Sequence, residues 1–372
     1  MRHFLSRKKT FKLITGILLI AILFGTQVYA APVFGASTFT EAYGKNLTGT
    51  YSGANPFSRW KKASEYKTNA AFANFRSMKG GSLGKNVIFR SRIPDELKDS
   101  SRIADLMMQD AGIKYVINFY ETKSALKSKF ANAEYNSYYY GKMVRNNRVT
   151  AARTLMQFET RQKLLNNRSA MIAGFKTIAA HAGPYLVHCA AGKDRTGLFS
   201  VIVEALMGAT YNEILNDYLQ TYINVGYKCT RATALSFCKK NLDFMLQLIT
   251  YSPSGSAWNK TDLAKKAERY LKDGGLNSGQ IRSIKKHLKK NYPDGTRVKN
   301  GNYYFTVKLK DSVTGYVIFT QQVAFGKDAV MPSPPEHDGY EFAGWSSDGK
   351  KIKEDCVITA NFTQKMSSKR AA

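Results

Sequence analysis

The residues best suited to chemistry lie between His188 and Gly197, where the chain reads His-Cys-Ala-Ala-Gly-Lys-Asp-Arg-Thr-Gly. An arginine follows the cysteine by six positions, and small residues with one glycine lie between them. Such a loop can turn several backbone N–H groups toward one tetrahedral anion. A helix expected to begin at Thr196 would bring the positive end of its dipole to the same point. The segment therefore predicts a phosphate-binding loop in which Cys189 is held as a nucleophilic thiolate.

The loop residues have distinct expected roles in phosphoryl transfer. Cys189 would attack phosphorus and form a phosphocysteine intermediate that water releases. Arg195 offers a planar fork for two phosphate oxygens, which lysine would not replace. The other phosphate contacts are expected from Ala190, Ala191, Gly192, Lys193 and Asp194.

The leaving group needs a proton, and Asp194 is the nearest donor within the loop. The alternative is that Asp194 only pairs with Lys193 or with loop amides, in which case Glu121 is the substitute acid. His188 is expected to support the loop from behind, with its side chain pointing away from the substrate. Thr196 would either hydrogen-bond Cys189 or serve only as a helix N-cap.

Strands and helices alternate around this loop. The pattern predicts short strands at 87–89, 114–119 and 185–188, and helices at 99–110, 156–180, 196–207, 211–222, 232–250, 260–272 and 278–290. A loop between strand 185–188 and the next helix lies at the carboxyl end of a strand, where α/β proteins bind ligands. We therefore expect an α/β fold with a central, mainly parallel sheet flanked by helices.

The loop resembles that of bacterial phosphatases grouped with tyrosine-specific and dual-specificity enzymes, particularly the subset whose loop is Cys-x-x-Gly-Lys-Asp-Arg and which resembles phosphoinositide phosphatases. Three upstream segments resemble the N-terminal signature of that family: Asn74-Phe75-Arg76, Gly80-Gly81 and Phe89-Arg90-Ser91. The resemblance covers roughly residues 70 to 290. It implies a tyrosine-phosphatase-like fold, a cysteine nucleophile, a phosphate-binding arginine, and loop Lys and Asp residues that shape substrate preference. It requires no metal and no cofactor.

The chain departs from that family at one position. Relatives usually carry Asp-Leu-Arg at the end of a strand, and this chain has Asn118-Phe119-Tyr120. The missing carboxylate shifts the expected acid role toward Asp194.

Both ends of the chain differ in composition from the middle. Basic residues precede an apolar run at 13–24 and small residues before Ala30, which predicts a signal peptide over 1–30 and a secreted or cell-surface protein. Residues 31–66 are expected to form an irregular lead-in, and 67–292 the phosphatase domain. Residues 300–365 predict a small β-rich module, in which Gly-Tyr-Glu-Phe-Ala-Gly-Trp at 339–345 resembles the β-grasp-like internalin B-repeat of bacterial surface proteins. That resemblance implies attachment or spacing, and a stabilising appendage without a ligand is the alternative.

The formal net charge is +29, and residues 1–30 account for five Lys/Arg and no Asp/Glu. A basic field with Lys193 in the loop favours phosphorylated substrates, namely phosphoinositides, phosphotyrosine peptides or inositol phosphates, and anionic membrane or cell-wall surfaces. Ten Lys/Arg between 260 and 290 could equally form a solvated helix face. No nucleic-acid-binding signature is present. The competing hypothesis is a surface-binding protein whose phosphatase domain is degenerate. Separately, Cys229 and Cys238 either form a disulfide across a turn or remain free thiols.

Overall fold

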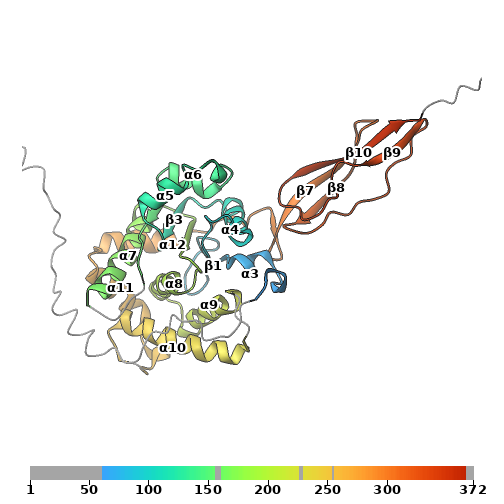
Figure 1. Ribbon diagram of the computed structural model, residues 1–372. Helices are drawn as coiled ribbons and strands as arrows, with labels where there is room; N and C mark the ends of the chain where they lie inside the picture. Colours follow the sequence, from blue (N-terminus) through green and yellow to red (C-terminus); the bar gives the residue numbers. More distant parts are fainter. Residues whose placement is uncertain (1–60, 156–160, 226–228, 254, 366–372) are drawn as a thin grey trace, which may run out of the picture. The chain divides into compact units, whose positions relative to one another are not determined.

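The computed structural model describes residues 61–155, 161–225, 229–253 and 255–365 (Figure 1). The predicted signal peptide and most of the lead-in lie outside these residues. Within them, no helix combines the length and apolarity that crossing a membrane requires. All four cysteines are free, so Cys229 and Cys238 do not pair.

A five-stranded sheet lies between Arg76 and His188. Its strands run in the order β1 (Arg76–Ser77), β2 (Ile88–Ser91), β5 (Tyr185–His188), β3 (Tyr115–Asn118) and β4 (Val149–Ala151). Only the short β1 is antiparallel to its neighbour, and the other pairs are parallel. The expectation of a mainly parallel sheet is confirmed.

The three central strands end at the same edge of the sheet. His188 at the end of β5 is in register with Ser91 at the end of β2 and with Asn118 at the end of β3. The segments that follow these strands therefore emerge side by side. This edge is the one at which parallel α/β sheets bind ligands.

Helices cover both faces of the sheet (Figure 1). Their bounds in chain order are α3 (Asn69–Ala73), α4 (Asp99–Asp110), α5 (Lys123–Lys129), α6 (Tyr139–Arg145), α7 (Arg161–Ala180), α8 (Asp194–Leu206), α9 (Tyr211–Asn224), α10 (Arg231–Thr250), α11 (Leu263–Asp273) and α12 (Ser278–Leu288), with 3-10 turns at Ala63–Glu65, Ala133–Tyr135 and Trp258–Lys260. Six of these ten described helices match predicted helices within three residues at both ends, whereas α3, α5 and α6 were not predicted. The predicted residues 156–160 of α7 lie outside the described part of the chain.

Alternating side chains of the buried strands serve the two faces. Val116 and Leu186 belong to the apolar cluster that includes residues of α4 and α6. The next residue on β3, Ile117, faces the opposite way toward α7. A Cβ on Gly174 of α7 would lie 2.9 Å from Ile117 Cγ2 and 2.7 Å from a ring carbon of Phe199 in α8, so only glycine permits this close packing.

Five further strands lie within residues 298–364. They are β6 (Val298–Lys299), β7 (Asn302–Asp311), β8 (Val317–Ala324), β9 (Tyr340–Trp345) and β10 (Cys356–Gln364). They make a second five-stranded sheet in the order β6-β7-β10-β9, with β8 paired to β7. Alternate residues of β7, from Tyr303 to Leu309, are buried in its core.

Candidate active site

The predicted loop lies at the carboxyl end of the central strand β5 and leads directly into α8. Cys189 follows β5 and is 2% exposed, while Ala190 and Ala191 are half-buried. Gly192 has a φ of +67°, and a Cβ there would lie 2.1 Å from the Ser91 carbonyl oxygen. Glycine at this position therefore allows both the left-handed turn and the close approach to the end of β2.

Helix α8 begins two residues earlier than the sequence predicts. Asp194 is its first residue and Lys193 occupies the cap, so the alternative that Thr196 serves as the N-cap is wrong. The turn at Gly192 lets the chain enter the helix at once, and a carboxylate in the first turn interacts favourably with the helix dipole. Thr196 instead lies buried in that turn, and its hydroxyl has no hydrogen-bond partner among the described residues.

Arg195 is anchored in the first turn of α8 by contacts with the segments that follow β3 and β4. Its Nη1 donates to the carbonyl oxygens of Phe119, at 3.1 Å, and Thr154, at 3.2 Å. The guanidinium carbon lies 5.2 Å from the centre of the Tyr120 ring. The guanidinium group is planar. The Nη1 hydrogen bonds and the contact with the Tyr120 ring therefore also fix the direction of the remaining N–H donors of Arg195.

Lys193 and Asp194 form an ion pair within the loop. The Nζ of Lys193 lies 3.6 Å from Asp194 Oδ1 and 5.1 Å from the centre of the Tyr222 ring. The Lys193 side chain is only 4% exposed, whereas that of Asp194 is 24% exposed. Asp194 is therefore the member of the pair that solvent or a substrate reaches.

His188 lies behind the loop in a buried hydrogen-bonded row. Its Nε2 lies 2.9 Å from the Tyr140 hydroxyl, which also accepts from Asn118 Nδ2 at 2.9 Å. Burial lowers the pKa of His188 to about 4, so the ring is neutral at neutral pH. The sequence indicated the supporting place of His188 but not the contribution of Tyr140, since a Tyr-Tyr-Tyr run is typical of packing as much as of hydrogen bonding.

Asn118 organises the turn after β3. Its side-chain oxygen accepts from the backbone N–H of Tyr120 at 2.7 Å and of Glu121 at 3.0 Å. Asparagine commonly forms such turns through its own side chain. The turn places Tyr120 beside Arg195 and Glu121 beside Asn118.

Glu121 does not suit the role of substitute acid. It forms an ion pair with Lys129, whose Nζ also lies 3.3 Å from Asp95 Oδ2. Although burial opposes it, hydrogen bonds from Asp95 and Lys129 lower the pKa of Glu121, so this carboxylate stays ionised. Burial raises the pKa of Asp95 well above its ordinary value, but this side chain is fully buried. Asp194 is also ion-paired, but its side chain is 24% exposed at the loop, so it is the carboxyl group that a leaving group can reach.

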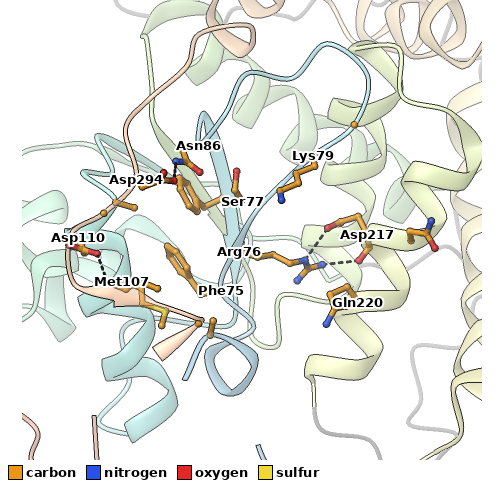
Figure 2. Close-up of a pocket in the computed structure, with 18 of the residues that line it drawn as sticks. Phe75, Arg76, Ser77, Lys79, Asn86, Met107, Asp110, Asp217, Gln220 and Asp294 are labelled. Atoms are coloured by element: carbon orange, nitrogen blue, oxygen red, sulfur yellow. Dashed lines mark hydrogen bonds and ion pairs between the residues drawn. The ribbon is translucent and has the colours of Figure 1, made fainter. Parts of the chain in front are cut away.

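Two pockets lie beside the sheet that carries the loop. A small one, about 330 Å³, is lined by Arg195, Arg153, Tyr120, Glu121, Thr122, Ala125 and Leu155. A larger one, about 780 Å³, lies at β1 and contains no loop residue, but Figure 2 shows that Arg76 points from it toward Asp217. Of the predicted loop residues, only Arg195 lines the small pocket.

Among the described residues, no three His, Cys, Asp or Glu side chains are grouped so that they could hold a metal ion. The groups that the structure brings together at the carboxyl edge of the sheet are a cysteine, an arginine, an ion-paired lysine and an accessible aspartate. A thiol-based phosphate site would require groups of these kinds.

A protein-family model described as the tyrosine phosphatase family matches residues 70–290. The match contains the whole sheet of β1 to β5 and the loop at its edge. The chain belongs to the tyrosine phosphatase family and is a phosphatase. No individual curated protein matches the chain.

Proposed function

We propose that this phosphatase is a secreted phosphomonoesterase that uses the Cys189 thiolate and a phosphocysteine intermediate, with phosphoinositides or phosphotyrosine as substrates. One observation carries the mechanism. Cys189 ends the central strand of a parallel sheet, and Arg195 lies in the first turn of the helix that the same loop enters. The nucleophile, the helix dipole and the guanidinium thus belong to one short segment.

In this mechanism Cys189 Sγ attacks phosphorus, and the bond from phosphorus to the leaving oxygen breaks. Asp194 donates a proton to that oxygen, and water then attacks the phosphocysteine and releases phosphate and the thiolate. Because the transition state is loose, positioning and positive charge supply most of the rate enhancement. Arg195, held in place by Phe119 and Thr154, is suited to the equatorial phosphate oxygens.

The pocket beside the loop supports a substrate with more than one anionic group. Its lining includes a second arginine, Arg153, which is exposed. Lys193 contributes less free charge than the sequence indicates, because it is ion-paired with Asp194. The basic residues of 260–290 are partly paired with an acidic residue: Glu268 forms ion pairs with Lys272 at 2.8 Å and with Lys285 at 2.7 Å, on α11 and α12. This pairing supports the alternative that these charges form a solvated helix face.

Phosphate release from p-nitrophenyl phosphate, phosphoinositides, inositol hexaphosphate and a phosphotyrosine peptide, compared at one salt concentration, tests the proposal. We expect turnover of the aryl phosphate, a higher kcat/KM for phosphoinositides, and phosphate on the Cys189 peptide by mass spectrometry after an acid quench. A preference for inositol hexaphosphate would replace the substrate assignment. A folded protein without any turnover would favour a degenerate, surface-binding protein.

The acid role of Asp194 predicts a dependence on the leaving group. Asp194→Asn should lower kcat by about 100-fold for an alkyl phosphate but far less for p-nitrophenyl phosphate, whose leaving group departs without a proton. Steady-state kinetics on both substrates measures this difference. Asp348→Asn, which changes an exposed carboxylate of the β module, should leave both rates unchanged. Equal losses on both substrates would mean that Asp194 acts only through Lys193.

Secretion and attachment remain predictions from the sequence. The proposed export signal precedes the residues that the structure describes. Detection of a mature N-terminus near Ala31 in culture medium would support export. A full-length N-terminus found only inside cells would contradict it.

A further inference from the structure

Three consecutive carbonyl groups of the loop are bound from outside by donors from one region of the chain. The Ala190 oxygen accepts from the Ile93 N–H at 3.0 Å. The Asn74 amide Nδ2 lies 3.2 Å from the Ala191 oxygen and 3.4 Å from the Gly192 oxygen, and Arg90 Nη2 donates to the Gly192 oxygen at 2.9 Å. The donors are Asn74, directly after α3, Arg90, within β2, and Ile93, two residues after β2.

These contacts determine where the loop amides point. A trans peptide unit is planar, and its C=O and the following N–H point in opposite directions. Holding the carbonyls of 190, 191 and 192 outward therefore directs the N–H groups of Ala191, Gly192 and Lys193 to the opposite side. Three adjacent N–H groups that point the same way form a concave anion site.

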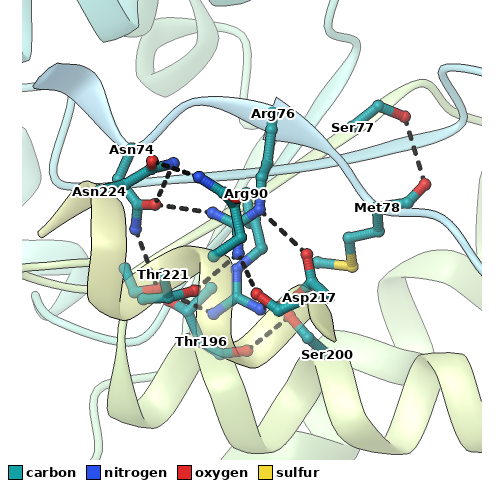
Figure 3. Close-up of polar contacts among 12 residues, drawn as sticks. Asn74, Arg76, Ser77, Met78, Arg90, Thr196, Ser200, Asp217, Thr221 and Asn224 are labelled. Atoms are coloured by element: carbon teal, nitrogen blue, oxygen red, sulfur yellow. Dashed lines mark hydrogen bonds and ion pairs between the residues drawn. The ribbon is translucent and has the colours of Figure 1, made fainter. Parts of the chain in front are cut away.

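Arg90 is held in place by a buried ionic cluster (Figure 3). It is fully buried, and its Nη1 pairs with Asp217 Oδ2 of α9 while Nη2 reaches the loop. Arg76 Nε pairs with the other oxygen of Asp217 at 3.0 Å. Although burial opposes it, these two arginines lower the pKa of Asp217, so the carboxylate remains ionised and orients both guanidinium groups.

Asn74 is fixed by a second set of contacts. It ends α3 with a φ of 49°, a left-handed conformation that asparagine tolerates better than most residues. Its Oδ1 accepts from Arg76 Nη1 at 2.6 Å and from Asn224 Nδ2 at 3.3 Å, which leaves its NH₂ group directed at the loop. Asn74 is only 1% exposed, so water does not compete for these contacts.

We propose that Arg90 and Asn74 are positioning residues that orient the amide groups of the phosphate loop for anion binding. The proposal rests on the proposed phosphatase function. Neither side chain has to touch the substrate, because each acts through a carbonyl of the loop. Arg76 and Asp217 hold Arg90 and Asn74 in place. Arg76 and Asp217 also line the larger pocket at β1 (Figure 2).

Arg90→Lys and Asn74→Gly test this role. Lysine retains the charge but cannot pair with Asp217 and reach Gly192 with a rigid fork. Glycine retains the left-handed backbone but lacks the amide. We expect the inhibition constant for orthovanadate to rise at least 10-fold in both variants. The pH at which Cys189 is half-maximally alkylated by iodoacetamide should also rise. Arg92→Lys is the matched control, because Arg92 donates to the Phe72 carbonyl at 3.2 Å.

The outcomes separate this proposal from the proposed function. If wild-type protein neither binds orthovanadate nor hydrolyses aryl phosphates, the proposed function fails. If wild-type protein does both and the folded Asn74→Gly variant keeps the wild-type inhibition constant and alkylation profile, the positioning role is wrong. A loss of melting temperature in Arg90→Lys with unchanged vanadate binding would likewise assign Arg90 to the fold alone.

Discussion

Replacement of Cys189 by serine is expected to lower kcat for p-nitrophenyl phosphate by at least about 1,000-fold, because a hydroxyl is not ionised where a thiol can be. Serine is nearly the same size, so the 2% exposed site should keep its shape and still bind phosphate. Stopped assays of phosphate release, together with the inhibition constant for orthovanadate, measure the two effects separately.

Cys238→Ser is the control for this experiment. Cys238 is fully buried in α10, and burial raises its pKa to about 12, so its thiol is protonated at neutral pH. Its replacement should leave kcat within a few-fold of wild type. If the Cys189→Ser variant kept most of its activity, the nucleophile would have to be another group.

The second large effect is expected for Arg195→Lys, with kcat/KM lower by about 1,000-fold. The guanidinium contacts two carbonyl oxygens and the Tyr120 ring, and its remaining N–H groups can bind phosphate. A lysine ammonium cannot keep these contacts and bind phosphate at the same time. Steady-state kinetics on an aryl phosphate checks the magnitude, and a melting curve checks the fold.

Arg153→Lys provides the comparison, because Arg153 lines the same pocket but is exposed. We expect it to spare the aryl phosphate and to lower kcat/KM only for substrates with a second phosphate. A loss below tenfold in Arg195→Lys would show that Arg195 serves the fold rather than the phosphate.

The sequence predicted three of the five strands of the first sheet, because the signals of buried strands are local, and it missed the short β1 and β4. Strand 185–188 and helix 99–110 appear at the predicted positions, since both depend on apolar runs and nearby breakers. The start of α8 was missed by two residues, because Thr196 resembles a cap while the turn at Gly192 depends on contact with Ser91. Propensity cannot report such a contact.

The supporting residues of the loop could not be derived in the same way. Asn74 and Arg90 were noticed only through a family resemblance, which did not give them a role. Their donors meet the carbonyls of Ala191 and Gly192 across more than a hundred positions of sequence. Tyr140 likewise reaches His188 only because α6 packs over the sheet. Side-chain contacts between distant segments follow from the fold, and no spacing rule encodes them.

The buried imidazole behind the loop has a consequence for acidic surroundings. With a pKa of about 4 against an ordinary 6.5, His188 stays largely neutral on mild acidification to pH 5, so the charge behind the anion site changes little. The unfolded chain does take up that proton. Acidification from 6.5 toward 4 therefore costs the folded state up to about 3 kcal/mol at this residue. A protein with this histidine would keep its anion site unaltered in weak acid while its resistance to unfolding declines.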